Sequence, residues 1–259
     1  MINDNDIQKL SRAGLQKLLN KGLFYKYINF NDGFEHVLKS NTLKFSDPEA
    51  FNDPFDCNEK LINISISEEY KKDLYKELEK KYHMTDKMRE LFGARANDPS
   101  IYRDALLRKK KEFKVSCFSE KCDEVLMWSH YADKHTGICI GFELEFMCTD
   151  YVFYPVNYIS EIVPVDGMTF TTNVFYYWLT TKSFRWEYEQ EIRAINKSGK
   201  EIVSFEKKAI KEILFGCKVT TPVIESVILE MGKMGYRNVA FNKMEIDPDT
   251  FLLKKVVIN

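Results

Sequence analysis

Glu189, Glu191 and Arg193 fall at every second position of one short segment of the chain, FRWEYEQEIRAINK. Glu191–Ala194 alternates polar and apolar residues, which predicts a strand with one buried face. Side chains two positions apart in a strand point the same way, so we expect the two carboxylates and the guanidinium to form one row. Such a row either lines a cleft or forms a ladder of ion pairs on the surface.

A second segment whose residues could take part in binding or catalysis is VSCFSEKCDEVLMWSHYADKHTGICIGF. It is predicted to form a strand, a helix and another strand at Val115–Phe118, Glu124–Asp133 and Ile138–Leu144. This order places Ser116, Ser119 and Glu120 at the end of a strand, above the start of a helix. Strand ends in mixed folds commonly carry binding residues, so we expect binding chemistry at this point.

A turn-rich loop, SDPEAFNDPFDCN, presents a third group of polar side chains. Asn52, Asp53 and Asp56 lie beside Phe51 and Phe55, which predicts a loop that is held to the core by its aromatic side chains. The loop is either a purely structural turn or one wall of a binding site.

The histidine and cysteine spacings do not favour a metal site or a thiol nucleophile. His130 and His135 are five positions apart, which puts them on different helix faces, and no two cysteines have a zinc-binding spacing, so we expect no bound metal. A Cys117 nucleophile with His130 as its base stays open, although Cys117 is expected to point inward. A metal-dependent nuclease or similar enzyme also stays open, built on Asp53, Asp56, Glu189 and Glu191.

The elements that must position these segments predict one α+β domain over residues 1–259. Helices are predicted at Asp4–Asn20, from Asn31 or Asp32 to Leu38, and at Glu68–Lys81, Asp86–Phe92, Ile101–Phe113, Val174–Thr180 and Pro222–Met234. Strands are predicted at Leu23–Ile28, Thr42–Phe45, Tyr151–Val156, Tyr158–Pro164, Val203–Phe205, Ile210–Phe215, Val239–Asn242 and Leu252–Val257. The charged helices at about 65–113 are expected to form an insertion with a solvated face.

The composition and the motifs that the chain lacks argue against several classes of protein. The 259 residues are 44% hydrophobic with a net charge of −1, so no global basic field indicates nucleic-acid binding, although a local groove could still be positive. The chain lacks GxGxxG and GxxxxGK[ST], which argues against a Rossmann or P-loop enzyme. Scattered cysteines, a polar start without signal-peptide features and the lack of an apolar run near ~20 residues predict a cytoplasmic protein without a membrane partner.

Three short segments together resemble the three-part motif of ADP-ribosyltransferases. They are YKY at 25–27, on a strand followed by a short helix and a second strand, SCFS at 116–119, and EQE at 189–191. The resemblance implies a split mixed or antiparallel sheet that clamps NAD, as substrate, without a Rossmann fold. In it, the first part holds the adenosine ribose or the phosphates and the serine strand supports the nicotinamide side, which assigns cofactor binding to Tyr25, Lys26, Tyr27, Ser116 and Ser119.

The same resemblance assigns roles to the two glutamates. Glu191 would be the catalytic carboxylate, which binds the nicotinamide ribose and stabilises an oxocarbenium-like transition state. Glu189 would orient the acceptor. The first part carries tyrosine and lysine where that superfamily usually has histidine or arginine, and the second part is CFSE instead of serine-threonine-serine.

Longer stretches resemble the bacterial domain-of-unknown-function family 2971. They are LFYKY, LKFSDPEAFNDPFDC, CFSE, LMWSHYADKHTGICIGFE, WEYEQEIR and AIKEILFG, and they extend over nearly the whole chain. Proteins of this kind are found among abortive-infection and other phage-defence candidates. The resemblance therefore implies an effector or toxin that modifies a nucleic acid or a protein, with a toxin–antitoxin partner.

The sequence thus predicts a cytoplasmic, NAD-dependent ADP-ribosyltransferase-like effector with Glu191 as its catalytic residue. The alternative is a non-enzymatic nucleotide- or protein-binding module, such as an antitoxin or a sensor. In that module the segment FNDPFD, His130 and Arg193 would form the recognition cleft.

Overall fold

The computed structural model describes residues 22–63, 68–96, 98–143, 151–163, 165–166 and 172–258. The predicted helix at Asp4–Asn20 lies outside the described residues, as do Leu144 and Pro164 at the ends of two predicted strands. In the described ranges, no helix is both long enough and apolar enough to cross a bilayer.

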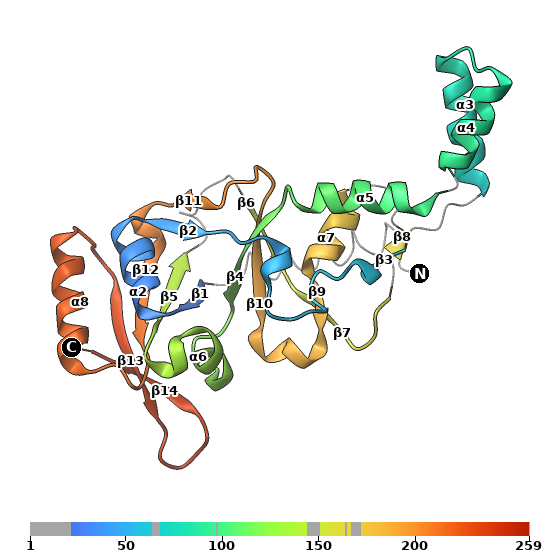
Figure 1. The fold of residues 1–259 in the computed structure, drawn as a ribbon. Coiled ribbons are helices and arrows are strands. Elements are labelled where there is room, and N and C mark those ends of the chain that lie inside the picture. The colour runs from blue at the N-terminus through green and yellow to red at the C-terminus, as the bar shows by residue number, and fades with distance from the viewer. Residues whose placement is uncertain are drawn as a thin grey trace.

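An eight-stranded mixed sheet with the order β14-β13-β12-β5-β1-β4-β10-β6 forms the centre of the fold (Figure 1). Its strands are β1 (Leu23–Ile28), β4 (Lys114–Ser119), β5 (Ile138–Glu143), β6 (Tyr151–Pro155), β10 (Glu191–Asn196), β12 (Ile210–Phe215), β13 (Ala240–Ile246) and β14 (Leu253–Val257). Neighbouring strands are antiparallel except β12 and β13, which are parallel because helix α8 (Thr221–Lys233) crosses over between them. The large mixed sheet with several helices agrees with the predicted α+β class.

Helices cover both faces of the central strands. Phe142 of β5 packs in one core cluster with Ile224 of α8, whereas the neighbouring Cys139 packs in another cluster with Trp128 of α6 (Val125–Tyr131). Alternate residues of a strand enter opposite faces of the sheet, so both sets must be apolar here. This explains why β5 is a continuous apolar run and not an alternating one.

β1 and β4 meet at a single register pair, Tyr25 with Ser119, as far as these two fully described strands show. By contrast, β1 pairs with β5 and β4 pairs with β10 over six positions each. The strands separate beyond the Tyr25–Ser119 pair. The sheet therefore consists of a five-stranded half and a three-stranded half that are joined at one point.

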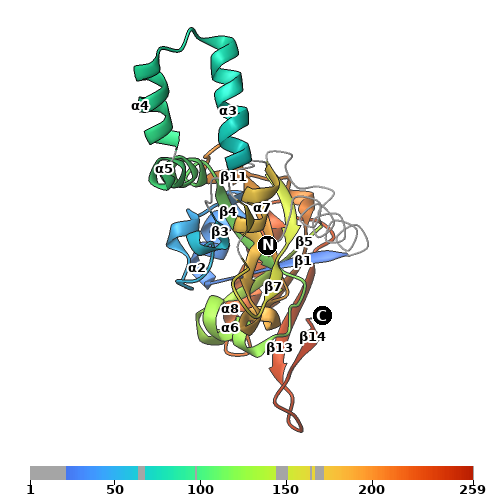
Figure 2. The same cartoon turned by 90° about the vertical axis from the view of Figure 1, so that its right-hand side faces the viewer.

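Three helices lie between β3 (Ile62–Asn63) and β4, and they are α3 (Glu68–Lys81), α4 (Asp86–Ala96) and α5 (Pro99–Lys110). Helices α3 and α4 project from the body as a hairpin, while α5 lies against the body (Figures 1 and 2). An exposed ion pair between Glu79 and Arg89 links α3 to α4. Leu106 of α5 packs with Trp178 of α7 (Thr172–Thr180), which anchors the hairpin to the core.

Short elements complete the fold. They are the strands β2 (Thr42–Lys44) with β11 (Ile202–Ser204), β3 with β8 (Val165–Asp166), and β7 (Asn157–Ile159) with β9 (Thr181–Ser183), and the 3₁₀-helices Pro48–Ala50, Glu59–Leu61, Asp133–His135, Phe184–Glu189 and Lys207–Ala209.

The first helical segment begins earlier than predicted. Asn29, and neither Asn31 nor Asp32, caps α2 (Phe30–Asp32), because its side-chain oxygen accepts a hydrogen bond from the Asp32 amide at 2.9 Å. A π-helix at Gly33–Lys39 continues the segment. The chain thus turns into the helix directly after β1, which leaves no linker between the two elements.

Candidate active site at the split of the sheet

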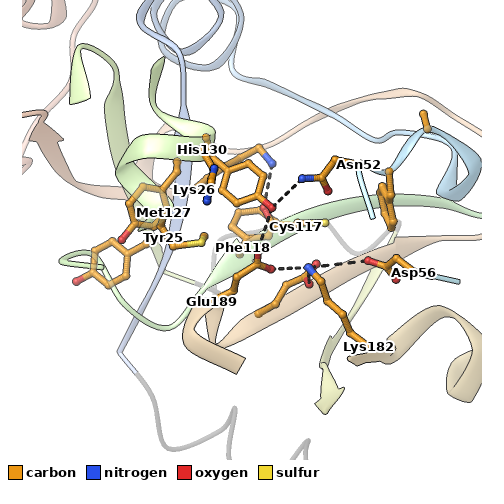
Figure 3. Close-up of a pocket in the computed structure, with 15 residues that line it drawn as sticks. Tyr25, Lys26, Asn52, Asp56, Cys117, Phe118, Met127, His130, Lys182 and Glu189 are labelled. Atoms are coloured by element: carbon orange, nitrogen blue, oxygen red, sulfur yellow. Dashed lines mark hydrogen bonds and ion pairs between the residues drawn. The ribbon is translucent and has the colours of Figure 1, made fainter. Parts of the chain in front are cut away.

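A cavity of about 400 Å³ opens beside the point where β1 and β4 separate (Figure 3). Strands β1, β4, β9 and β10, helix α6 and the loop that follows Pro48–Ala50 form its walls. The lining residues are Tyr25, Lys26, Tyr27, Ala50, Phe51, Asn52, Asp56, Cys117, Phe118, Met127, His130, Tyr131, Lys182, Glu189 and Glu191.

Lys26 lies in the gap between the two halves of the sheet. Its Nζ donates to Ser116 Oγ at 2.9 Å and to the main-chain oxygen of Cys117 at 3.0 Å, and it lies 5.1 Å from the centre of the Phe118 ring. Among the described residues, no carboxylate forms an ion pair with this ammonium group. Desolvation lowers the pKa of Lys26, and this effect outweighs the opposite influence of Cys117 and Glu191.

Arg193 is completely buried beneath the cavity and binds two carboxylates at once. Its Nε donates to Glu191 Oε1 at 2.8 Å, and its Nη1 and Nη2 donate to the two oxygens of Asp56 at 2.8 and 2.5 Å. Nη1 also donates to the main-chain oxygen of Leu179 at 2.7 Å, and the Phe51 ring packs 5.0 Å from the guanidinium. Such paired contacts use the rigid fork of the guanidinium, so Arg193 fixes the carboxylates and does not reach a ligand.

Lys182 completes this buried network. Its Nζ lies 2.5 Å from Glu189 Oε2, 3.0 Å from Glu191 Oε2 and 3.9 Å from Asp56 Oδ2. Three carboxylates against two cations leave a formal charge of −1. None of the five side chains is more than 4% exposed, so the alternative of a surface ladder was wrong.

Glu189 does not belong to the strand that we predicted for it. It ends the 3₁₀-helix Phe184–Glu189, and Gln190 then turns the chain with φ 43° and ψ 51° before β10 begins at Glu191. This left-handed turn brings the two carboxylates onto one ammonium group. Ser119 holds the turn, because its Oγ donates to the main-chain oxygen of Glu189 at 2.6 Å. The predicted single strand row was therefore wrong, although its three side chains do converge.

The environment pushes the pKa values of the two glutamates in opposite directions. Burial alone would raise the pKa of Glu191, but the charges of Arg193 and Lys182 hold it well below its usual range. Burial raises the pKa of Glu189, and the negative charge of Glu191 raises it further, against the opposing effect of Lys182. One carboxylate thus stays ionised while its neighbour is able to exchange a proton, which is a division found at sites of acid–base chemistry.

Tyr131 connects Glu189 to the opposite wall. Its hydroxyl donates to Glu189 Oε1 at 2.8 Å and accepts from Asn52 Nδ2 at 3.5 Å. Helix α6 positions Tyr131, and the helix starts where the Glu124 side chain accepts a hydrogen bond from the Leu126 amide. In Figure 3, His130 lies with Lys26 on one side of the cavity, and Glu189 and Lys182 lie on the other.

The geometry of the cavity does not favour a thiolate nucleophile or a cluster of metal ligands in the described residues. Cys117 lines the cavity, but burial raises the pKa of its thiol well above the usual value, which opposes a thiolate nucleophile. In the described part of the chain, no three His, Cys, Asp or Glu side chains converge as metal ligands. Asp56, Glu189 and Glu191 are instead held by the two cations, and Asp53 lies outside the cavity lining.

A family model matches residues 127–194. Its family is described as "Protein of unknown function (DUF2971)", and the match supports the resemblance to family 2971. The matched segment runs from α6 to β10 and contains Tyr131, Lys182, Glu189 and Glu191. No curated protein and no solved structure matches the chain.

The predicted site residues divide into two groups around the cavity. Eight of them line it, and these are Tyr25, Lys26, Tyr27, Asn52, Asp56, His130, Glu189 and Glu191. Ser116 and Ser119 lie behind the wall, where they bind Lys26 and the Glu189 turn. Arg193 lies beneath the cavity and Asp53 lines a different pocket, so neither side chain lines the cavity itself.

Lys182 and Tyr131 are the site residues that the sequence interpretation missed. Lys182 had a usable signal, because it is the single charged residue between Asp166 and Arg185. A lone charge in a run of apolar and neutral residues indicates a buried ionic contact. Tyr131 had no such signal, since its spacing with Val125 and Trp128 is that of a core stripe.

Proposed function

We propose that the protein transfers the ADP-ribosyl group of NAD to an acceptor at this cavity. The observation that carries the proposal is the polarity of the cavity. One wall holds a carboxylate network with an excess negative charge, and the other holds Lys26, a half-buried cation without a carboxylate partner in the described residues.

This polarity suits a dinucleotide that is positive at one end and negative in the middle. The positively charged nicotinamide ribose would lie at Glu189 and Glu191. The diphosphate would neutralise Lys26, which supplies the ammonium that a buried anion requires. Tyr25, Tyr27 and Phe118 offer apolar and aromatic surface between the two charged walls.

The two glutamates suit different steps of the transfer. The bond between the ribose and nicotinamide breaks, its electron pair leaves with neutral nicotinamide, and positive charge develops on the ribose. Glu191, which stays ionised, stabilises that charge. The acceptor then bonds to the ribose carbon and loses a proton, and Glu189 is the group able to receive it.

The arrangement of the motifs also supports the proposal. The resemblance to ADP-ribosyltransferases assigned the first, second and third parts to three strands of a split sheet. Here β1, β4 and β10 are neighbours in the sheet, and β1 and β4 separate next to the cavity. A role as an effector or toxin in phage defence, with a protein or nucleic-acid acceptor, remains a prediction from resemblance.

The test is nicotinamide release from NAD by the purified protein, compared with Glu189→Gln and Glu191→Gln. Removing a well-placed charge at a transition state costs on the order of 10²–10³ in rate. Because Glu191 is bound to two buried cations, each variant needs a urea unfolding curve beside its rate. NAD binding without release in the wild-type protein would contradict the transfer and identify a nucleotide-binding module.

A further inference from the structure

A second, smaller pocket of about 240 Å³ lies on the other side of Lys182, which lines both cavities. Strand β9, the start of the 3₁₀-helix Phe184–Glu189 and the loop around Asp53 form its walls. Its volume is below the ~300–1,000 Å³ that drug-sized ligands occupy. The pocket therefore suits one planar ring system, not a whole dinucleotide.

Asp53, which lines this pocket, has one carboxylate oxygen that accepts no hydrogen bond from the described residues. The residue is 6% exposed, and its Oδ2 has no hydrogen-bond partner among the described residues, whereas Oδ1 accepts from the Phe55 amide at 2.9 Å. Burying a carboxylate oxygen without a hydrogen-bond donor costs free energy. Native proteins contain few such groups, so each one indicates a donor supplied by a ligand or by solvent. The guest must therefore present an N–H or O–H group to Oδ2.

Aromatic side chains flank the pocket. Trp186 is partly exposed, and the Lys182 ammonium lies 4.9 Å from its ring centre, which holds the indole in place. Phe55 also lines the pocket and is 63% exposed, so its ring is accessible to a guest. Aromatic walls beside a hydrogen-bonding group are the common means of holding an unstacked base.

The formal charges of the lining residues sum to zero, because the pocket is lined by Asp53, Glu161, Lys182 and Arg185. Lys182 also pairs with Glu189 and Glu191, so its charge is shared with the network of the first cavity. The experiment below therefore compares neutral nucleosides with a cationic guest, methylguanidine. Arg185 is exposed at the rim, where it is able to meet a phosphate that follows the base.

We propose that this pocket binds a nucleobase with an exocyclic amine, which donates to Asp53 Oδ2 while the ring packs against Trp186. The inference names a nucleic-acid acceptor for the proposed transfer and rests on the proposed function for that step alone. Binding of the base itself does not depend on NAD.

The experiment measures binding of free nucleosides to the full chain without NAD, by calorimetry and by tryptophan fluorescence. Cytidine is compared with uridine, and adenosine with inosine, because the first member of each pair has an exocyclic amine beside an unprotonated ring nitrogen, and the second has a carbonyl beside a ring N–H. The amine-bearing member should bind roughly 10- to 100-fold more tightly, as expected for one hydrogen bond to a charged group. Quenching should report the contact, since Trp128 and Trp178 are buried, and Trp186→Phe should abolish it.

The Asp53→Asn variant gives a more specific test of the hydrogen bond to Oδ2. Its oxygen is still able to accept from the Phe55 amide, and its Nδ2 then places a donor where Oδ2 was. The preference should reverse, so that uridine and inosine bind more tightly than cytidine and adenosine. Damage to the loop would weaken all four nucleosides and would not reverse their order.

Several results would overturn this inference. They are equal affinity within both nucleoside pairs, no binding of any nucleoside, an unchanged preference in Asp53→Asn, or tighter binding of methylguanidine than of any nucleoside. NAD turnover is assayed separately. Its absence would remove the transfer step and leave the nucleoside result as it stands.

Discussion

Replacing Arg193 by methionine tests whether the buried network is a stabilising unit. Methionine keeps much of the side-chain volume but leaves Asp56, Glu189 and Glu191 with Lys182 as their cation, which changes the formal charge of the network from −1 to −2. Five hydrogen bonds from Arg193 to Glu191, Asp56 and Leu179 disappear with the guanidinium.

The expected loss of unfolding free energy follows from the carboxylate charge that Arg193→Met leaves uncompensated in the network. Breaking a buried ion pair by removing one partner costs ~3–5 kcal/mol, because it leaves an uncompensated buried charge. A typical native state is stable by about 5–15 kcal/mol, so the loss is a large share of the total. With an m value near the upper end of the ~1–3 kcal/mol/M range, the urea midpoint should fall by roughly 1–2 M.

Acid unfolding gives an independent view of the same network. Because the folded pKa of Glu191 lies below its ordinary value near 4.5, its contribution to stability is present above that pH and is lost as the pH falls below it. The raised pKa of Glu189 acts in the opposite sense and offsets part of the loss. In Arg193→Met the main cause of the depressed pKa is absent, so stability should depend less on pH in this range.

The matched control is Arg103→Met, which removes an exposed arginine that pairs with Glu59 at the surface. Its urea midpoint should equal that of the wild-type protein. Arg193→Lys keeps the charge but loses the fork, and it should lie between the wild-type protein and Arg193→Met. An Arg193→Met midpoint equal to that of Arg103→Met would refute the reasoning.

Two further substitutions and one change of pH test the groups of the cavity. Lys26→Met should weaken NAD binding at least ~10-fold, the effect of one hydrogen bond to a charged group, as calorimetry would show. NAD affinity of the wild-type protein should fall as the pH rises through the lowered pKa of Lys26, and that dependence should vanish in Lys26→Met. Tyr131→Phe removes a hydrogen bond that lowers the pKa of Glu189, so the rise of the transfer rate with pH should move to higher pH. An unmoved profile in Tyr131→Phe, or NAD affinity in Lys26→Met equal to wild type at every pH, would contradict these assignments.

The strands were predictable because their signal is local. Apolar runs and alternation predicted β1, β4, β5 and β12 within about one residue, since the same apolar side chains that define the pattern fill the two faces of the sheet. The helix α6 followed from the spacing of Val125, Trp128 and Tyr131 in the same way.

The geometry of the site was harder to predict from the sequence, because it depends on contacts between distant segments. Gln190 adopts a left-handed conformation that no glycine marks, so the turn beneath Glu189 looked like a continuous strand. Lys182 reaches Glu189 and Glu191 only because α7 leads β9 alongside β7 next to the network. The separation of β1 from β4 depends on sheet pairing, which residue types alone do not encode.

Nicotinamide release from NAD is the measurement that tests the central claim most directly. The wild-type protein should release nicotinamide, and Glu191→Gln should release it on the order of 10²–10³ times more slowly while remaining folded at the assay temperature. Release by a folded Glu191→Gln variant at the wild-type rate would contradict the account, as would a wild-type protein that neither binds nor cleaves NAD.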